Sequence, residues 1–65
     1  MRATVGDRLH MRGSKVGEAD KVAEIIEVRG ANGTPPYWVR FSDGRESLIY
    51  PGPDSVVLSP EGTVR

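Results

Sequence analysis

A segment with proline at both ends, residues 35–51, most constrains how this chain can fold. Two runs rich in aromatic and β-branched residues, 37–41 and 45–50, flank the pair Asp43-Gly44 within it. An Asp-Gly pair between two such runs predicts a β-hairpin with a two-residue type I′ turn, in which both central residues have positive φ. Proline lacks the backbone N–H that a strand ladder needs, so the hairpin is expected to stop at the prolines.

Counting outward from a two-residue turn predicts the register of the hairpin, with Val39 opposite Leu48 and Trp38 opposite Ile49. Side chains alternate between the two faces of a strand pair. The face expected to fill a core carries Tyr37, Val39, Phe41, Leu48 and Tyr50. The opposite face is mixed in character and carries Trp38, Arg40, Ser42, Arg45, Ser47 and Ile49. This second face, centred on Trp38, is therefore the place to look for function.

The chain has 65 residues and no cysteine, which places it near the lower size limit for a single hydrophobic core. Without cysteine, neither disulfides nor a thiolate zinc site can stabilise so small a domain. A sheet that closes into a barrel removes open edges and is the economical architecture. The apolar runs are far shorter than the roughly 20 residues that cross a bilayer, and no N-terminal stretch suggests a signal peptide, so a cytoplasmic location is expected.

Residues 5–11 alternate in polarity and predict the first strand. Its inward face is expected to carry Val5, Asp7, Leu9 and Met11, and its outward face Arg8 and His10. Residues 14–20 have no period and contain turn formers, which predicts a loop of the kind that carries recognition in small barrels.

Residues 21–29 mix helical and strand signals. We favour a strand because the run is rich in β-branched residues and is followed by turn residues. The neighbours Ile25 and Ile26 cannot both face the core of a flat strand, which predicts a β-bulge or strong coiling at this point.

The pair Asn32-Gly33 predicts a second turn with positive φ. Residues 51–55 read as a rigid proline corner, and residues 55–58 as a short closing strand. Together these elements predict an all-β fold, a five-stranded antiparallel SH3-like barrel in a single domain of residues 1–58. Residues 59–65 are expected to form a flexible, disordered C-terminal tail.

The charges are balanced overall but unevenly placed. Residues 1–15 contain four basic residues and one acidic residue, whereas residues 16–28 contain one basic residue and four acidic residues. Neighbouring strands of opposite charge stabilise their own pairing, and this explains the pattern better than a basic binding stripe does. A net charge of zero also argues against strong non-specific binding to nucleic acid.

No catalytic or metal-binding constellation stands out, so we predict that the protein is not an enzyme and has no cofactor and no metal. The single histidine, His10, cannot make a multi-histidine site, and an ordinary surface role explains it. The glycines fall at turns, and no phosphate-binding loop motif occurs.

The segments V-G-D-R-L, K-V-A-E-I-I-E-V-R-G, P-P-Y-W-V-R-F-S-D-G-R-E and P-G-P-D occur in this order up to about Leu58. Read together they resemble the short actinobacterial proteins of the domain-of-unknown-function family DUF1918. The resemblance implies a small SH3-like barrel and no established activity. Three positions depart from the family pattern: Phe41 replaces a frequent tryptophan, Ala23 a frequent glycine and Arg45 a frequent histidine.

The leading functional hypothesis is a non-catalytic module that binds a protein or peptide partner. The expected contact residues are Trp38, Arg40, Arg45 and Ile49, with Arg8, Arg12 and the loop 14–20 beside them. The alternative is a nucleic-acid-binding module that uses the basic first strand and an exposed aromatic side chain. An exposed pair of Trp38 and Ile49 would also serve as a homodimer contact.

Overall fold

The structure, a computed structural model, describes residues 1–13, 17 and 19–64. Its five strands are β1 (Arg8–Met11), β2 (Lys21–Val28), β3 (Tyr37–Phe41), β4 (Glu46–Ile49) and β5 (Val56–Leu58). A short 3-10 turn, η1 (Ala31–Gly33), lies between β2 and β3. Within these described ranges no helix is long and apolar enough to cross a membrane.

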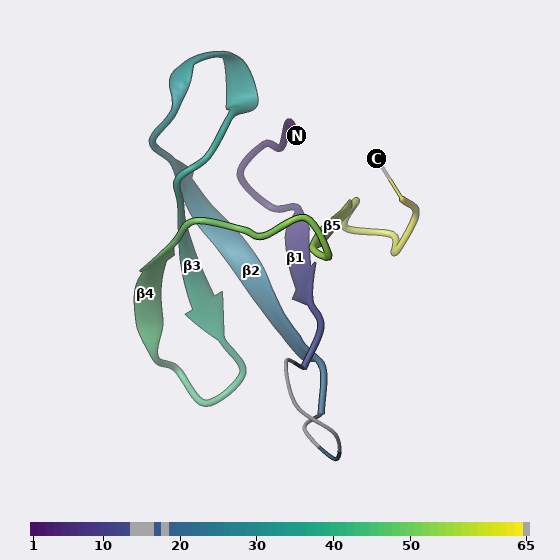
Figure 1. Cartoon of the computed structure of the whole chain (residues 1–65). Helices are drawn as coiled ribbons and strands as arrows, with labels where there is room; N and C mark the ends of the chain where they lie inside the picture. Colours follow the sequence, from purple (N-terminus) through teal and green to yellow (C-terminus); the bar gives the residue numbers. More distant parts are fainter. Residues whose placement is uncertain (14–16, 18, 65) are drawn as a thin grey trace.

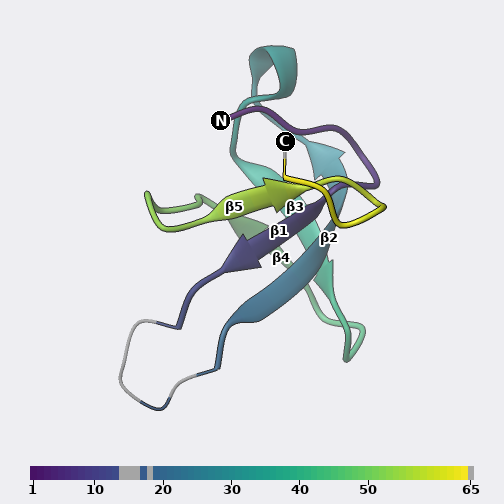
Figure 2. The ribbon, with the colours of Figure 1, turned by 90° about the vertical axis from the view of Figure 1, so that its right-hand side faces the viewer.

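The strands form one antiparallel sheet in the order β4-β3-β2-β1-β5 (Figure 1). The first four strands follow one another as a meander, and β5 returns to pair with β1. The sheet coils strongly, so that β1 and β5 are seen crossing β3 and β4 in the side view (Figure 2). The predicted all-β, five-stranded antiparallel fold is confirmed, and the strand order suits a small SH3-like barrel.

The core lies on the inner face of the coiled sheet, where alternate residues of the strands meet. Its buried apolar members are Ala3, Leu9, Ala23, Ile25, Tyr37, Val39 and Val57. Met11, Val28, Phe41 and Ile49 are partly buried and pack against this cluster. Every strand therefore contributes to one small core, as expected for a single domain without disulfides.

The predicted irregularity in β2 is confirmed as a β-bulge. Ile25 pairs with Val39, but the next pair joins Glu27 to Trp38, so Ile26 is the additional residue. The bulge lets Ile25 be fully buried while its neighbour Ile26 is only partly buried.

The predicted register of the central hairpin is wrong by one residue. Trp38 pairs with Leu48, not Ile49, and the backbone N–H of Phe41 donates to the carbonyl oxygen of Arg45 at 2.7 Å. Three residues, 42–44, therefore form the loop. Among the described residues other than glycine only Asn32 has positive φ, so Asp43 does not meet the requirement of a type I′ turn.

The one-residue shift exchanges the two faces of β4. Ile49, predicted on the mixed face, pairs with Tyr37 and packs against the core. Leu48 and Tyr50, predicted in the core, are 38% and 75% exposed. A loop of three residues with a glycine at positive φ as its last residue is also a common hairpin connection, and Gly44 supplies that conformation with φ of 89°.

The first strand begins at Arg8 rather than at residue 5. Gly6 adopts φ of 99°, and the N–H of Asp7 donates to the carbonyl oxygen of Thr4 at 3.0 Å, which forms a turn before the strand. Val5 is therefore 65% exposed, and the prediction that it faces the core is wrong. Asp7 does face inward and is buried.

The N-terminal segment and η1 close the end of the barrel at which β3 begins. Asn32 and Gly33 have φ of 57° and 83°, which confirms the predicted turn of positive φ. The carbonyl oxygen of Gly33 accepts a hydrogen bond from the N–H of Ala3 at 2.8 Å and another from the hydroxyl of Tyr37 at 2.7 Å. One carbonyl thus links three segments of the chain.

Residues after β5 turn back toward it. The N–H of Ser59 donates to the carbonyl oxygen of Thr63 at 2.7 Å, and Val64 makes an isolated antiparallel bridge with Leu58. The domain boundary at Leu58 and the disorder of residues 59–65 stay predictions.

Candidate functional site

Trp38 lies on the outer face of β3, directly after the buried Tyr37, because consecutive side chains of a strand point to opposite faces. Its side chain is half-buried. The indole N–H donates to Oε1 of Glu46 on β4 at 3.0 Å, and the guanidinium carbon of Arg29 lies 5.8 Å from the centre of the ring. Trp38 is therefore partly covered by charged side chains of its own chain.

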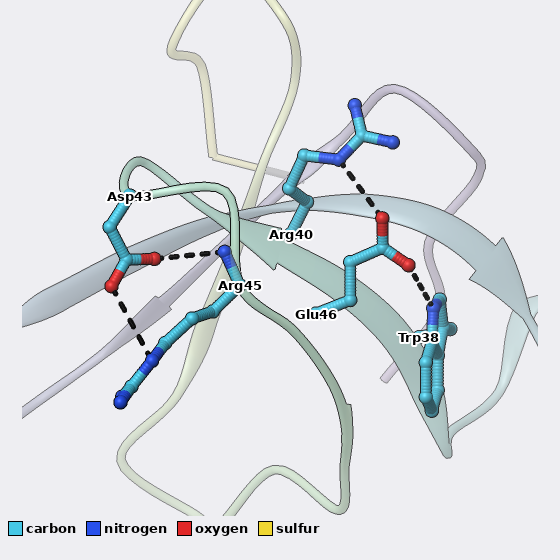
Figure 3. A network of polar contacts seen from close by, with 5 residues as sticks. All are labelled: Trp38, Arg40, Asp43, Arg45 and Glu46. Carbon is cyan, nitrogen blue, oxygen red and sulfur yellow. Dashed lines mark hydrogen bonds and ion pairs between the residues drawn. The ribbon is translucent and has the colours of Figure 1, made fainter.

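Glu46 joins Trp38 to Arg40 (Figure 3). Nε of Arg40 donates to Oε2 of Glu46 at 3.4 Å, while Oε1 accepts from the indole. The hydrogen bond from Trp38 holds the pKa of Glu46 below its ordinary value, partial burial opposes this effect, and Arg40 adds to it. Both side chains of the ion pair are about half exposed, so this network meets solvent.

The strand register shows which residues lie beside Trp38 on the sheet. Leu48 of β4 and Glu27 of β2 are its two cross-strand neighbours. Nε of Arg29 lies 2.8 Å from a carboxylate oxygen of Glu27, so the cation above the indole is itself paired. The surface around Trp38 thus combines one aromatic ring, one exposed leucine and charges of both signs, a composition found at protein interfaces.

Two predicted contact residues do not join Trp38. Ile49 lies on the inner face, as its pairing with Tyr37 requires. Arg45 lies at the hairpin loop, where its side chain is 83% exposed and its Nε is 3.8 Å from Asp43. Figure 3 shows the pair of Asp43 and Arg45 apart from the network of Trp38, Glu46 and Arg40.

The other two predicted arginines are Arg8, on β1 and thus two strands away from β3, and Arg12, just after β1. Arg8 is exposed and pairs in register with Glu24, which in turn pairs with Arg40. Arg12 is exposed just beyond the end of β1. The structure therefore brings Arg8, Arg40 and Trp38 to one side of the sheet and leaves Arg12 at its end.

The predicted recognition loop 14–20 lies largely outside the described residues. Of its described members, Asp20 closes the loop on β1: its Oδ1 accepts the N–H of Gly13 at 3.0 Å, and its Oδ2 lies 3.1 Å from Nε2 of His10. The hydrogen bond from Gly13, together with the contact to His10, lowers the pKa of Asp20.

Four neighbours of Trp38 were missed by the sequence reasoning: Glu27, Arg29, Glu46 and Leu48. Two of them follow directly from the register error, because the correct register turns Glu46 and Leu48 outward. The bulge at Ile26 brings Glu27 opposite Trp38, so a register count that included the bulge would have found it.

The described surface has shallow grooves. An apolar groove, of about 490 Å³, lies between the N-terminal segment and η1, with Val5, Val28 and Gly33 in its wall. A more polar groove, of about 660 Å³, lies between the start of β2 and the hairpin loop. In the part of the chain that the structure describes, no group of three or more His, Asp or Glu side chains is placed to hold a metal ion.

The topology defines a small all-β, barrel-like protein. The chain belongs to the family described as "Domain of unknown function (DUF1918)", whose family model matches residues 1–57. The predicted family membership is thereby confirmed.

Relatives in mycobacteria are named as uncharacterised proteins. Rv2302 of Mycobacterium tuberculosis is 50% identical over 60 residues, which cover 91% of this chain and 75% of that protein. Rv0569 of the same organism is 42% identical over 62 residues, which cover 94% of this chain and 70% of that protein.

A solved structure supports the fold. The solution structure of the conserved hypothetical protein Rv2302 matches this chain with a TM-score of 0.64 and 46% identity. The match covers 95% of this chain and 84% of that chain.

Proposed function

We propose that this protein is a non-catalytic binding module that takes a protein or peptide partner on the outer face of β3 and β4. The contact residues are Trp38, Leu48, Arg40 and Glu46. This set keeps Trp38 and Arg40 from the sequence prediction and replaces Ile49 with Leu48, which the register turns outward.

The observation that carries the proposal is the position of Trp38. It is the only tryptophan of the chain, yet it lies outside the core, and its indole contacts the surface side chains of Glu46 and Arg29. Tryptophan and arginine are the residue types most enriched at energetic hot spots of protein interfaces. A partner would bury the exposed parts of the indole and of Leu48 without breaking any strand pairing.

The nucleic-acid alternative is less well supported. Three arginines that could meet phosphates already have carboxylate neighbours of this chain: Arg29 with Glu27, Arg40 with Glu46, and Arg45 with Asp43. A phosphate would have to displace these carboxylates, and the net charge of zero supplies no long-range attraction. A cytoplasmic location and the absence of catalytic activity are part of the proposal.

Photo-crosslinking at Leu48 tests the proposal. A benzophenone side chain placed at this position in the cell is expected to give discrete protein adducts, because Leu48 is exposed beside Trp38. Replacing Trp38 with serine in the same protein should remove the adducts, provided that circular dichroism shows the variant folded. Adducts that persist without the indole would contradict the proposed site.

The matched control places the same probe at Val64, which is 66% exposed near the C-terminus. Equal adducts from both positions would indicate non-specific labelling and would count against the proposal. For the alternative, amide shifts are followed while single-stranded and duplex oligonucleotides are added at low and moderate salt. Salt-sensitive shifts at Arg8, Arg12, Trp38 and Arg40 would favour nucleic acid instead.

A further inference from the structure

The sheet has two edges, and the chain covers them unequally. At one edge, the residues after β5 return along it: the N–H of Ser59 donates to the carbonyl oxygen of Thr63 at 2.7 Å, and Val64 makes a bridge with Leu58. At the other edge β4 pairs with β3, and none of the residues that the structure describes pairs with its second side. Figure 1 shows this side of β4 at the outside of the molecule. We call it the open edge.

The register shows which backbone groups the open edge presents. The N–H of Phe41 donates to the carbonyl oxygen of Arg45, and hydrogen-bonded pairs alternate with non-hydrogen-bonded pairs along an antiparallel ladder. Ser47, two residues further on, therefore points its N–H and carbonyl groups toward β3. The corresponding groups of Glu46 and Leu48 point away from β3. Such groups are satisfied by water or by another strand.

The side chains along the open edge are apolar or have a partner in the chain. Leu48 is 38% exposed, and Tyr50, two residues further on, is 75% exposed. The two charged residues at the start of the edge, Arg45 and Glu46, each form an ion pair within the hairpin. An uncharged, apolar segment therefore complements this edge better than an ionic one does.

We propose that the partner is an extended, uncharged peptide segment that adds to the open edge as a further strand, with its backbone hydrogen-bonded to Glu46 and Leu48. An extended backbone offers N–H and carbonyl groups at the spacing that these residues require. The inference rests on the proposed function, because it states how a peptide partner of the same surface binds.

The spacing of strands determines which side chain the partner needs. The added strand would lie about 4.8 Å from β4 and about 10 Å from β3, where Trp38 is the cross-strand neighbour of Leu48. A side chain level with Leu48 must therefore extend across it to reach the indole. Aromatic side chains are long, rigid and apolar, so the partner carries an aromatic residue at this position.

The inner side of the same edge has room for a second apolar side chain. A groove of about 250 Å³ lies at the end of β4, with Met11, Ile49, Pro51 and Pro53 in its wall. Met11 and Ile49 also pack against the core, so the groove continues the apolar surface of the barrel. Side chains of an extended segment alternate in direction, so a residue next to the aromatic one would face the groove.

Amide hydrogen exchange of the full chain tests the inference. The probe is a synthetic peptide, selected for binding to the chain from a phage-displayed library of short random peptides. In the free protein the amides of Glu46 and Leu48 should exchange quickly and that of Ser47 slowly. Saturating peptide should slow exchange at Glu46 and Leu48 by about tenfold or more, because both N–H groups become hydrogen-bonded, and should leave Ser47 unchanged.

Removal of single N–H groups tests the ladder from both sides. N-methylation of alternate residues of the peptide should abolish binding, whereas N-methylation of the intervening residues should not, because only alternate N–H groups point toward β4. On the protein, replacing the amide of Leu48 with an ester by chemical synthesis should weaken binding about fivefold. This ester should leave the stability of the protein unchanged. The matched control, an ester at Ser47, should lower stability, because that N–H points toward β3.

A double-mutant cycle tests the aromatic residue of the partner. Replacing this residue of the peptide with alanine should weaken binding to the wild-type chain by about fivefold or more. The same replacement should have a smaller effect on binding to the Trp38→Ser protein, because the indole that it contacts is absent. Equal effects on the two proteins would overturn the contact between the aromatic residue and the indole.

Failure to select a peptide, or a peptide that leaves exchange at Glu46 and Leu48 unchanged, would overturn the inference. The proposed function would still stand if Leu48 crosslinks to another protein in a manner that depends on Trp38, since side chains alone can bind a partner on the outer face. Slowed exchange at both amides together with Trp38-dependent adducts would support both proposals. Unchanged exchange together with adducts that persist without the indole would overturn both.

Discussion

Two adjacent aromatic residues of β3 meet very different surroundings. Tyr37 points inward, is fully buried, and donates its hydroxyl proton to the backbone carbonyl of Gly33 at 2.7 Å. Trp38 points outward, is half-buried, and donates its indole proton to the side chain of Glu46 at 3.0 Å. The hydroxyl of Tyr37 is thus hydrogen-bonded to backbone, whereas the indole N–H of Trp38 is hydrogen-bonded to a side chain at the surface.

The difference separates the end of the barrel around Tyr37, which the chain itself closes, from the outer face around Trp38, which is partly exposed to solvent. Burial raises the pKa of the Tyr37 hydroxyl, and the nearby charge of Asp7 acts in the same direction. Around Tyr37 the chain has closed on itself through η1 and the N-terminal segment. Trp38 instead contacts the side chains of Glu46 and Arg29, both of which lie at the surface.

The largest expected effect is the loss of Tyr37. Tyr37→Ala should destabilise the protein by about 3–5 kcal/mol, as measured for buried aromatic truncations, and should leave a small domain largely unfolded. Trp38→Ala should cost about 1–2 kcal/mol, because only part of its surface is buried. Urea unfolding of both variants measures the difference, and equal losses would show that Trp38 belongs to the core.

The second effect concerns Gly30, which precedes η1. A Cβ atom at Gly30 would collide with the backbone carbonyl oxygens of Thr34 and Pro35, which cannot move independently of the loop. Gly30→Ala should therefore cost about 1–3 kcal/mol through overpacking. Gly52→Ala is the matched control: its Cβ meets no atom within 4 Å and its φ is not in the left-handed region, so its effect should be near zero. Similar changes in melting temperature for the two variants would contradict close packing of the loop around Gly30.

A smaller effect is expected from the titration of Glu46. Its pKa is lower in the folded protein than in the unfolded chain, chiefly because of the hydrogen bond from Trp38. This contact therefore contributes stability above the unfolded-state pKa, and the contribution is lost as the pH falls through the lower, folded-state pKa. The indole N–H resonance of Trp38 should shift across this acidic range. In Glu46→Gln that titration should disappear, and its persistence would assign the shift to another group.

The smallest effect is expected from the titration of Asp20. This prediction tests whether a second exposed carboxylate titrates in the same direction as Glu46. Asp20 accepts the N–H of Gly13 and contacts His10, and its pKa is lowered in the folded state. Its contribution should likewise be present above the unfolded-state pKa and be lost on acidification. The amide resonance of Gly13 should follow that titration in the wild type but not in Asp20→Asn. A Gly13 shift that is identical in both proteins would show that the contact does not form in solution.

Local signals in the sequence were sufficient for the elements and the fold class. The neighbouring isoleucines predicted a bulge or strong coiling in β2, because two adjacent residues of a flat strand cannot both face the core. Asn32-Gly33 predicted the turn of positive φ, because both residue types tolerate that conformation. The alternation in β3 also predicted correctly that Tyr37 and Val39 face inward and Trp38 outward.

The tertiary structure decided the face of β4 and hence the composition of the candidate site. Asp43-Gly44 is compatible with a loop of two or three residues, since Gly44 takes positive φ in either case. The choice between them turns every side chain of β4 over, and it depends on whether Ile49 or Leu48 faces the core. Packing across the barrel makes that choice, because burial of Ile49 depends on residues distant in the sequence, which no local pattern specifies.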